Sequence, residues 1–181
     1  MPYSRAAVDA PFGAIPHGNP LRVTKYRTAA GHVAIYPGDF VGMLADSVVA
    51  TITSVTASMI LGVAAEYLAA ASTDGIQAYD HPQQRFVIQD DGDTTPMTAL
   101  SEGLVAALII TTGNTTSLRS AHEIDASTAA AAPTVAVGHS LKIERLAEVE
   151  ADSYASAAGS PRRWIVSVLP LFHQLATTRG I

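Results

Sequence analysis

Short extended runs, separated by closely spaced turn signals, are the feature that most limits the folds open to this chain. Residues that favour turns, above all Gly, Pro, Asp and Asn, recur about every 8 to 15 residues. The runs between them are rich in β-branched and aromatic side chains or alternate polar with apolar ones, and both patterns favour strands. We predict a mainly β fold, a β-barrel or sandwich of short strands with one or two short helices. The expected strands are 22–28, 32–36, 48–55, 60–72, 76–79, 85–89, 141–144 and 164–168.

Three segments lack a clear alternation. Leu and Ala favour helix in 60–72, but we assign a strand there because β-like segments lie within turn distance on both sides. Thr95 as an N-cap and Pro96 at the first helical position predict one short helix in 94–108. The Ala-rich run Ala126–Pro133 has no periodic face, which indicates a loop or a weak helical turn.

The first 21 residues cannot form a sustained helix, because prolines and glycines interrupt them. These residues are Pro2, Pro11, Gly13, Pro16, Gly18 and Pro20. We therefore expect an extended N-terminal arm over 1–21 and a single β-rich domain over 22–181. Two roles stay open for the arm: a strap that reaches a neighbouring subunit, or a terminus draped over its own domain. Phe12 and Ile15 are apolar anchors in both.

The composition excludes several classes of partner. With 11 Lys plus Arg residues and a net charge of −5, the chain has no basic stripe of the kind that binds nucleic acid. No window reaches the run of about 18 apolar residues that crosses a membrane, and the start MPYSRAAVDAPFG lacks the apolar centre of a signal peptide. We therefore expect synthesis in the cytoplasm, no direct nucleic-acid partner and no membrane partner.

The balance of side chains favours assembly. Charged residues make up only 15% of the chain, against about 25% in a typical globular protein, while hydrophobic residues make up 48%. A surface built from Ala, Thr and Ser suits a protein that lies against neighbours. The absence of cysteine excludes disulfides and thiolate ligands, so histidine and carboxylates are the strong metal ligands that remain.

The stretch Tyr79–Asp93 holds a dense group of acidic and imidazole side chains. Asp80 and His81 lie in a Pro-containing turn, and Asp90, Asp91 and Asp93 lie in a Gly-containing one. A straight strand between the turns places them roughly 25 to 30 Å apart, too far to share an ion. The second turn lacks the alternating acidic ligands and the distal Glu of a helix-loop-helix calcium site, so we interpret both turns as connections that flank a strand.

No motif for catalysis is evident in the sequence. The six histidines include no pair at the i, i+4 spacing, AHEID (121–125) lacks the second His of zinc proteases, and G-x-S-x-G does not occur. We predict that the chain is not an enzyme and uses neither a metal nor another cofactor. Two alternatives remain open. A small metal-dependent hydrolase would need dispersed His and Asp residues to converge, and a carbohydrate-binding module would need Trp164 and Tyr154 to form an exposed face.

Six short motifs follow one another over most of the chain. They are PFGAIPHGNPLRVTKYRT, YPGDFV, ILGVAAEY, YDHPQQRFVIQDDG, GNTTSLRSAHEID and RRWIVSVLPLFHQL. In this order they resemble the capsid decoration (cement) and head structural proteins of tailed bacteriophages. The Ala-rich stretch Ala126–Ala132 departs from that pattern.

The resemblance implies a virion protein that binds the outer surface of the expanded phage head and stabilises the capsid lattice. Its partner would be the major capsid protein, and it would act as a homo-oligomer, a dimer or a trimer, on the capsid. A virion-attached carbohydrate-binding β module is the alternative. We expect interface contacts from the arm and the two turns, at Phe12, Ile15, Pro16, Asp80, His81 and Asp91. If the arm is a strap, deleting residues 1–19 should weaken attachment and leave the isolated fold intact.

Overall fold

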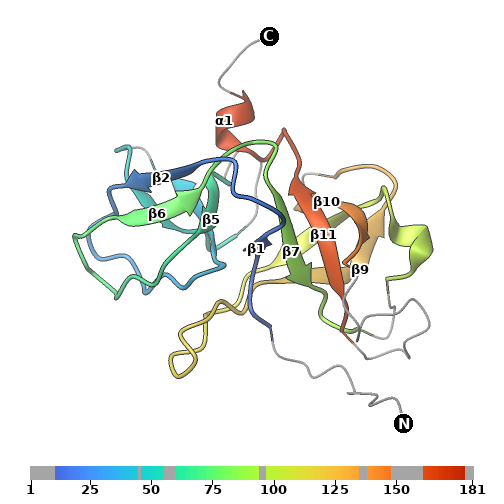
Figure 1. Cartoon of the computed structure of the whole chain (residues 1–181), viewed down its shortest axis with the longest axis horizontal. Coiled ribbons are helices and arrows are strands. Elements are labelled where there is room, and N and C mark those ends of the chain that lie inside the picture. The colour runs from blue at the N-terminus through green and yellow to red at the C-terminus, as the bar shows by residue number, and fades with distance from the viewer. Residues whose placement is uncertain are drawn as a thin grey trace.

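The computed structural model describes residues 11–44, 46–54, 60–93, 97–134, 138–147 and 161–177. Within them the chain is mainly β, as predicted, and its strands form two antiparallel sheets that lie side by side (Figure 1). The large sheet has the order β1 (Ile15–Pro16), β7 (Arg85–Gln89), β11 (Arg163–Val168), β10 (His139–Leu146), β8 (Val105–Ile109) and β9 (Glu123–Ala130). The small sheet has the order β2 (Val23–Tyr26), β6 (Ile76–Tyr79), β5 (Gly62–Ala64), β3 (Phe40–Met43) and β4 (Val49–Thr51).

Each sheet curls until strands near its two ends meet. In the large sheet a parallel bridge joins Asp90, just after β7, to Ile124 in β9. In the small sheet a parallel bridge joins Thr28, just after β2, to Val49 in β4. Because edge groups are paired in this way, both sheets approach the closed form of a small barrel.

The two sheets share a core. Alternate residues of the large sheet, such as Phe86, Val166 and the fully buried Trp164, point into one hydrophobic cluster. Phe40 of β3 points into the same cluster, whereas its neighbour Val41 points into a second cluster inside the small sheet. Successive side chains of a strand lie on opposite faces, so β3 is buried on both sides and joins the two sheets.

Most expected strands are confirmed. The strands 76–79 and 85–89 occur with the predicted bounds, and β2 and β4 lie within the segments predicted for them, although residue 55 is outside the described residues. The choice of strand over helix in 60–72 is correct in part, since β5 lies near its start and Leu68 forms an isolated bridge further on. β11 begins one residue earlier than predicted, and β10 extends beyond 141–144 at both ends.

Three local predictions are wrong. Residues 32–36 form no strand, and only Ile35 makes an isolated bridge, to Leu68. Within the described residues 97–108 the expected helix is limited to a short 3-10 helix, η1 (Ala99–Ser101), which Thr98 caps and β8 follows. Thr95 and Pro96 lie outside the described residues. The predicted loop 126–133 contains the second half of β9.

The helices are short. Besides η1, the described residues contain α1 (Gln174–Thr177), which follows the turn after β11. Among the described residues, no helix combines the length and the apolar character needed to cross a membrane.

The described part of the arm, residues 11–21, is draped over its own domain. β1 pairs with β7, and Ala14 is buried in the shared core. The Ala14 amide donates to the Gly38 carbonyl at 3.0 Å, and a Cβ atom added to Gly13 would lie 2.3 Å from the Cβ of Ser120. Residues 14–16 therefore pack on the domain, in line with the second of the two roles left open for the arm. The part of the arm before residue 11 lies outside the described residues.

Candidate functional site

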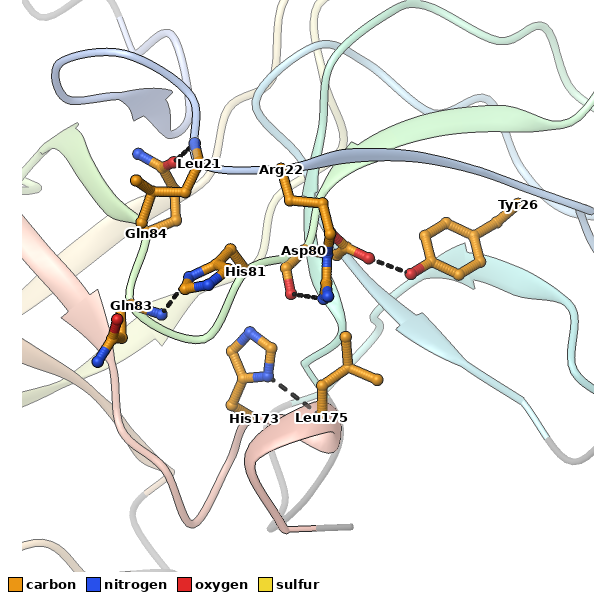
Figure 2. Close-up of polar contacts among 9 residues, drawn as sticks. All are labelled: Leu21, Arg22, Tyr26, Asp80, His81, Gln83, Gln84, His173 and Leu175. Atoms are coloured by element: carbon orange, nitrogen blue, oxygen red, sulfur yellow. Dashed lines mark hydrogen bonds and ion pairs between the residues drawn. The ribbon is translucent and has the colours of Figure 1, made fainter. Parts of the chain in front are cut away.

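Asp80 is the centre of a polar cluster at the end of β6 (Figure 2). Its buried carboxylate accepts a hydrogen bond from Arg22 Nε at 2.6 Å through Oδ1 and another from the Tyr26 hydroxyl through Oδ2. Burial alone would raise the pKa of Asp80, but the hydrogen bonds from Arg22 and Tyr26 outweigh burial and hold this pKa below its ordinary value. Burial and the bond to Asp80 raise the pKa of Tyr26 to about 12. Asp80 therefore acts as an ionised anchor for β2.

Two histidines lie beside this carboxylate. His173 is buried at the start of α1, and its Nδ1 accepts a hydrogen bond from the Leu175 amide at 3.2 Å. Burial lowers the pKa of His173 to about 4, against the attraction of Asp80. His81 is partly exposed, and its Nδ1 accepts from the Gln83 amide at 3.1 Å. Figure 2 shows both rings on the side of the cluster away from Tyr26. His173 is thus a neutral ring next to an ion pair.

The turn after Asp80 is tied to the end of the arm. The buried side chain of Gln84 accepts from the Leu21 amide at 2.9 Å (Figure 2), and it donates to the Arg85 carbonyl at 2.8 Å. The arm, this turn and the end of β11 enclose an open hollow of about 600 Å³. Its lining combines polar and apolar residues: His17, Asn19, Leu21, Pro82, Gln83, Gln84, Arg85, Glu144, Ser167, Val168 and Pro170. The arm and the turn after Asp80, which the sequence analysis singled out separately, therefore lie side by side.

Asp90 anchors the opposite end of β7. Its Oδ1 accepts from the Arg162 amide at 2.7 Å, and its Oδ2 accepts from Trp164 Nε1 at 2.9 Å. Burial raises the pKa of Asp90, although these two hydrogen bonds oppose the shift. Asp91 accepts from the Ala126 amide in β9 at 3.3 Å. This acidic turn thus closes the large sheet, and it lies apart from Asp80, as the sequence predicted.

A third buried pair lies between the sheets. Asp39 Oδ2 accepts from the Tyr36 amide at 2.9 Å, and Asp39 Oδ1 faces Nε2 of His122 at 3.6 Å. The other ring nitrogen, Nδ1, accepts from the Phe40 amide, so the neutral ring carries its proton on the side of Asp39. Burial lowers the pKa of His122, while Asp39 opposes this shift. The Ser120 hydroxyl oxygen accepts from the backbone amide of His122 and not from its ring. Because the two ring nitrogens face the Phe40 amide and Asp39, neither is directed to a nucleophile.

The three arm residues predicted at an interface line one apolar hollow. Phe12, Ile15 and Pro16 contribute to a hollow of about 300 Å³ together with Ala14, Pro37, Gly38, Ala64, Ala65, Tyr79 and Arg119. Ile15 is 50% exposed, and the Phe12 ring lies 5.5 Å below the guanidinium carbon of Arg163. Pro16 has no amide hydrogen, so β1 cannot offer a complete ladder to another strand.

The described residues give little support to the two alternative functions, a carbohydrate-binding module and a metal-dependent hydrolase. Trp164 is buried and bonded to Asp90, so its ring is not available to stack on a sugar, and Tyr154 lies outside the described residues. Within the described ranges no three His, Asp or Glu side chains gather at metal-binding distances. Sequence reasoning missed Arg22, Gln84 and His173, because the contacts that bring them into this cluster, to Asp80 and to Leu21, span long stretches of the chain and leave no local signal.

A comparison with known proteins found no family model, no curated protein and no solved structure that matches this chain.

Proposed function

We propose that this chain is a structural virion protein that decorates the outer surface of an expanded phage head and stabilises the capsid lattice. One observation carries the proposal. The arm is fixed to the domain by backbone pairing and by Gln84, yet Ile15, Leu21 and Val23 keep 50%, 56% and 43% of their surface exposed. Large apolar side chains held rigidly on one exposed segment are typical of a surface that another protein covers.

The ordered motifs described above and the low share of charged residues, 15%, support the same role. Their resemblance to decoration proteins names the partner as the major capsid protein. A protein that binds the expanded lattice and not its precursor stabilises the expanded form by mass action, because lattice opening must also break every decorating contact. Many weak contacts repeated over the head then add to a large effect.

The test is the copy number of this chain relative to the major capsid protein in purified particles, measured by quantitative mass spectrometry. A ratio near one, or a simple fraction such as one third, is the expected result for decoration of the whole lattice. A few copies per particle would place the chain at a tail, portal or fibre instead. Complete absence from particles would remove the virion role.

A second measurement tests the mechanism. Heads that lack this chain should lose their DNA at a lower temperature than complete heads, and adding the purified chain back should restore the difference. Equal release temperatures for both kinds of head would show that attachment contributes nothing to lattice stability, even if the copy number is high.

A further inference from the structure

The apolar hollow beneath the arm has a preformed backbone. Gly38 connects its two walls: its carbonyl accepts from the Ala14 amide at 3.0 Å, and its own amide donates to the Ala64 carbonyl at 2.9 Å. One wall belongs to the arm and the other to the small sheet and the loop before β3. A hollow built from fixed backbone and small apolar side chains can accept a partner without first ordering itself, which favours binding.

Two arginines border this hollow. Arg119 lines it directly, and Arg163 lies over the ring of Phe12, which forms part of the wall. Neither guanidinium forms an ion pair with a carboxylate in the part of the chain that the structure describes. The chain as a whole carries a net charge of −5, so two such cations beside one apolar hollow are a local reversal of its charge. Guanidinium groups in this position match carboxylates in charge and in planar geometry.

We infer that this hollow receives an extended apolar segment with flanking carboxylates from the major capsid protein, and that Arg119 and Arg163 bind those carboxylates. The inference rests on the proposed function and names the contact through which it would operate. The apolar side chains of the segment would pack against Phe12, Ile15 and Ala65. Because Pro16 interrupts the ladder of β1, the contact is made through side chains rather than by adding a strand to the large sheet.

The experiment uses purified expanded heads that lack this chain and the purified full-length chain, separated by sedimentation after mixing. Arg119→Gln should weaken attachment about tenfold, because it leaves a carboxylate without its partner in the contact. The double variant Arg119→Gln and Arg163→Gln should also lose most of the salt dependence that the unaltered chain shows. Ala65→Trp fills the hollow and should weaken attachment at low and high salt alike.

Arg27→Gln is the matched control, since Arg27 is an exposed arginine that does not line the hollow. It should attach as the unaltered chain does, and thermal unfolding should confirm that each variant is folded. If the unaltered chain binds heads and the Arg119, Arg163 and Ala65 variants bind equally well, the inference is wrong and the proposed function stands. If the unaltered chain itself fails to bind heads, both are wrong.

Discussion

At the scale of single residues, three buried carboxylates organise this protein. Asp39 lies between the sheets, Asp80 joins β6 to β2, and Asp90 joins β7 to β11. A buried carboxylate is costly unless donors surround it, and each of these accepts hydrogen bonds from backbone or side-chain groups. The three carboxylates therefore have a structural role, since they accept hydrogen bonds that join neighbouring strands and loops. Removing one of these carboxylates leaves its donors buried without an acceptor.

Asp90→Ala is expected to destabilise the fold by about 2 to 4 kcal/mol, because the Trp164 indole and the Arg162 amide both lose their acceptor. Urea denaturation followed by the fluorescence of Trp164 measures this loss. Asp74→Ala is the control, since Asp74 is exposed and bonds only within its own turn, and it should change stability by less than about 0.5 kcal/mol. Equal effects of the two substitutions would contradict the anchoring role of Asp90.

His173 makes stability depend on pH. Its folded pKa of about 4 lies below the ordinary value of 6.5, so the unfolded chain binds a proton there before the folded chain does. Its contribution is complete above pH 6.5 and is lost as pH falls toward about 4, a change of about 3 kcal/mol. The carboxylate of Asp80 stays ionised over this range, because its pKa is lowered.

His173→Asn keeps an acceptor for the Leu175 amide but cannot take up a proton. The variant should therefore lose less stability than the unaltered chain between pH 7.5 and pH 4, a difference of about 3 kcal/mol in unfolding free energy. His17→Asn, at an exposed position, serves as the control and should follow the unaltered chain. Parallel pH profiles for all three proteins would show that His173 does not titrate as described.

Sequence reasoning placed Asp80 and Asp90 in two separate turns, and that was correct, but it could not identify their partners. Arg22 lies 58 positions from Asp80, and Trp164 lies 74 positions from Asp90. Only the pairing of strands brings such residues together. The composition of a turn predicts its bend, whereas the role of its carboxylate depends on the sheet that forms around it.

At the scale of elements, close packing of β5 against β6 depends on Gly62. A Cβ atom on Gly62 would lie 2.2 Å from the Tyr79 carbonyl oxygen, and backbone cannot move aside as a flexible side chain can. Gly62→Ala should cost about 3 kcal/mol. Gly31→Ala is the comparison: Gly31 has a φ of 70° with open space around it, so only the strained backbone, about 1 kcal/mol, opposes the change. Urea midpoints should rank the two variants in this order.

Local pattern predicted the strands whose side chains alternate and failed where Ala dominates. β7 buries Phe86 and Ile88, which alternate with the less buried Arg85 and Val87, and it was found with its correct bounds. β9 was missed because its second half, Ala126–Ala130, carries no contrast between its faces, and pairing with β8 decides its structure. There the Thr128 hydroxyl accepts from the Ala107 amide across a register shift, a contact that no local rule predicts. In 97–108 helix propensity is likewise outweighed at the C-terminal end, where β8 pairs with β10 on one side and β9 on the other.

At the scale of the whole molecule, the shared core should make the two sheets unfold together. Phe40 belongs to the small sheet but packs within 6.2 Å of the Phe86 ring centroid and stacks on His122. Phe40→Ala should cost about 3 to 5 kcal/mol and lower the midpoint of the whole transition. Trp164 fluorescence reports the large sheet and far-ultraviolet circular dichroism reports both sheets. Two separate transitions, with that of Trp164 unchanged, would mean that the sheets are independent.

The described part of the arm packs on its own domain, which is the second of the two roles that the sequence left open for it. Deleting residues 1–19 removes β1 from the edge of β7 and takes Ala14 out of the shared core. The truncated chain should therefore lose on the order of 2 to 4 kcal/mol of stability, rather than keep its fold intact. Urea denaturation measures this loss. An unchanged midpoint would mean that the arm does not stabilise its own domain, as expected for a strap that reaches a neighbouring subunit. If the truncated chain is destabilised as expected, its weak attachment to heads does not distinguish a lost contact from a loss of folding. Ile15→Ser, which changes one half-exposed side chain, is the variant that separates attachment from folding: it should weaken attachment and leave the urea midpoint almost unchanged.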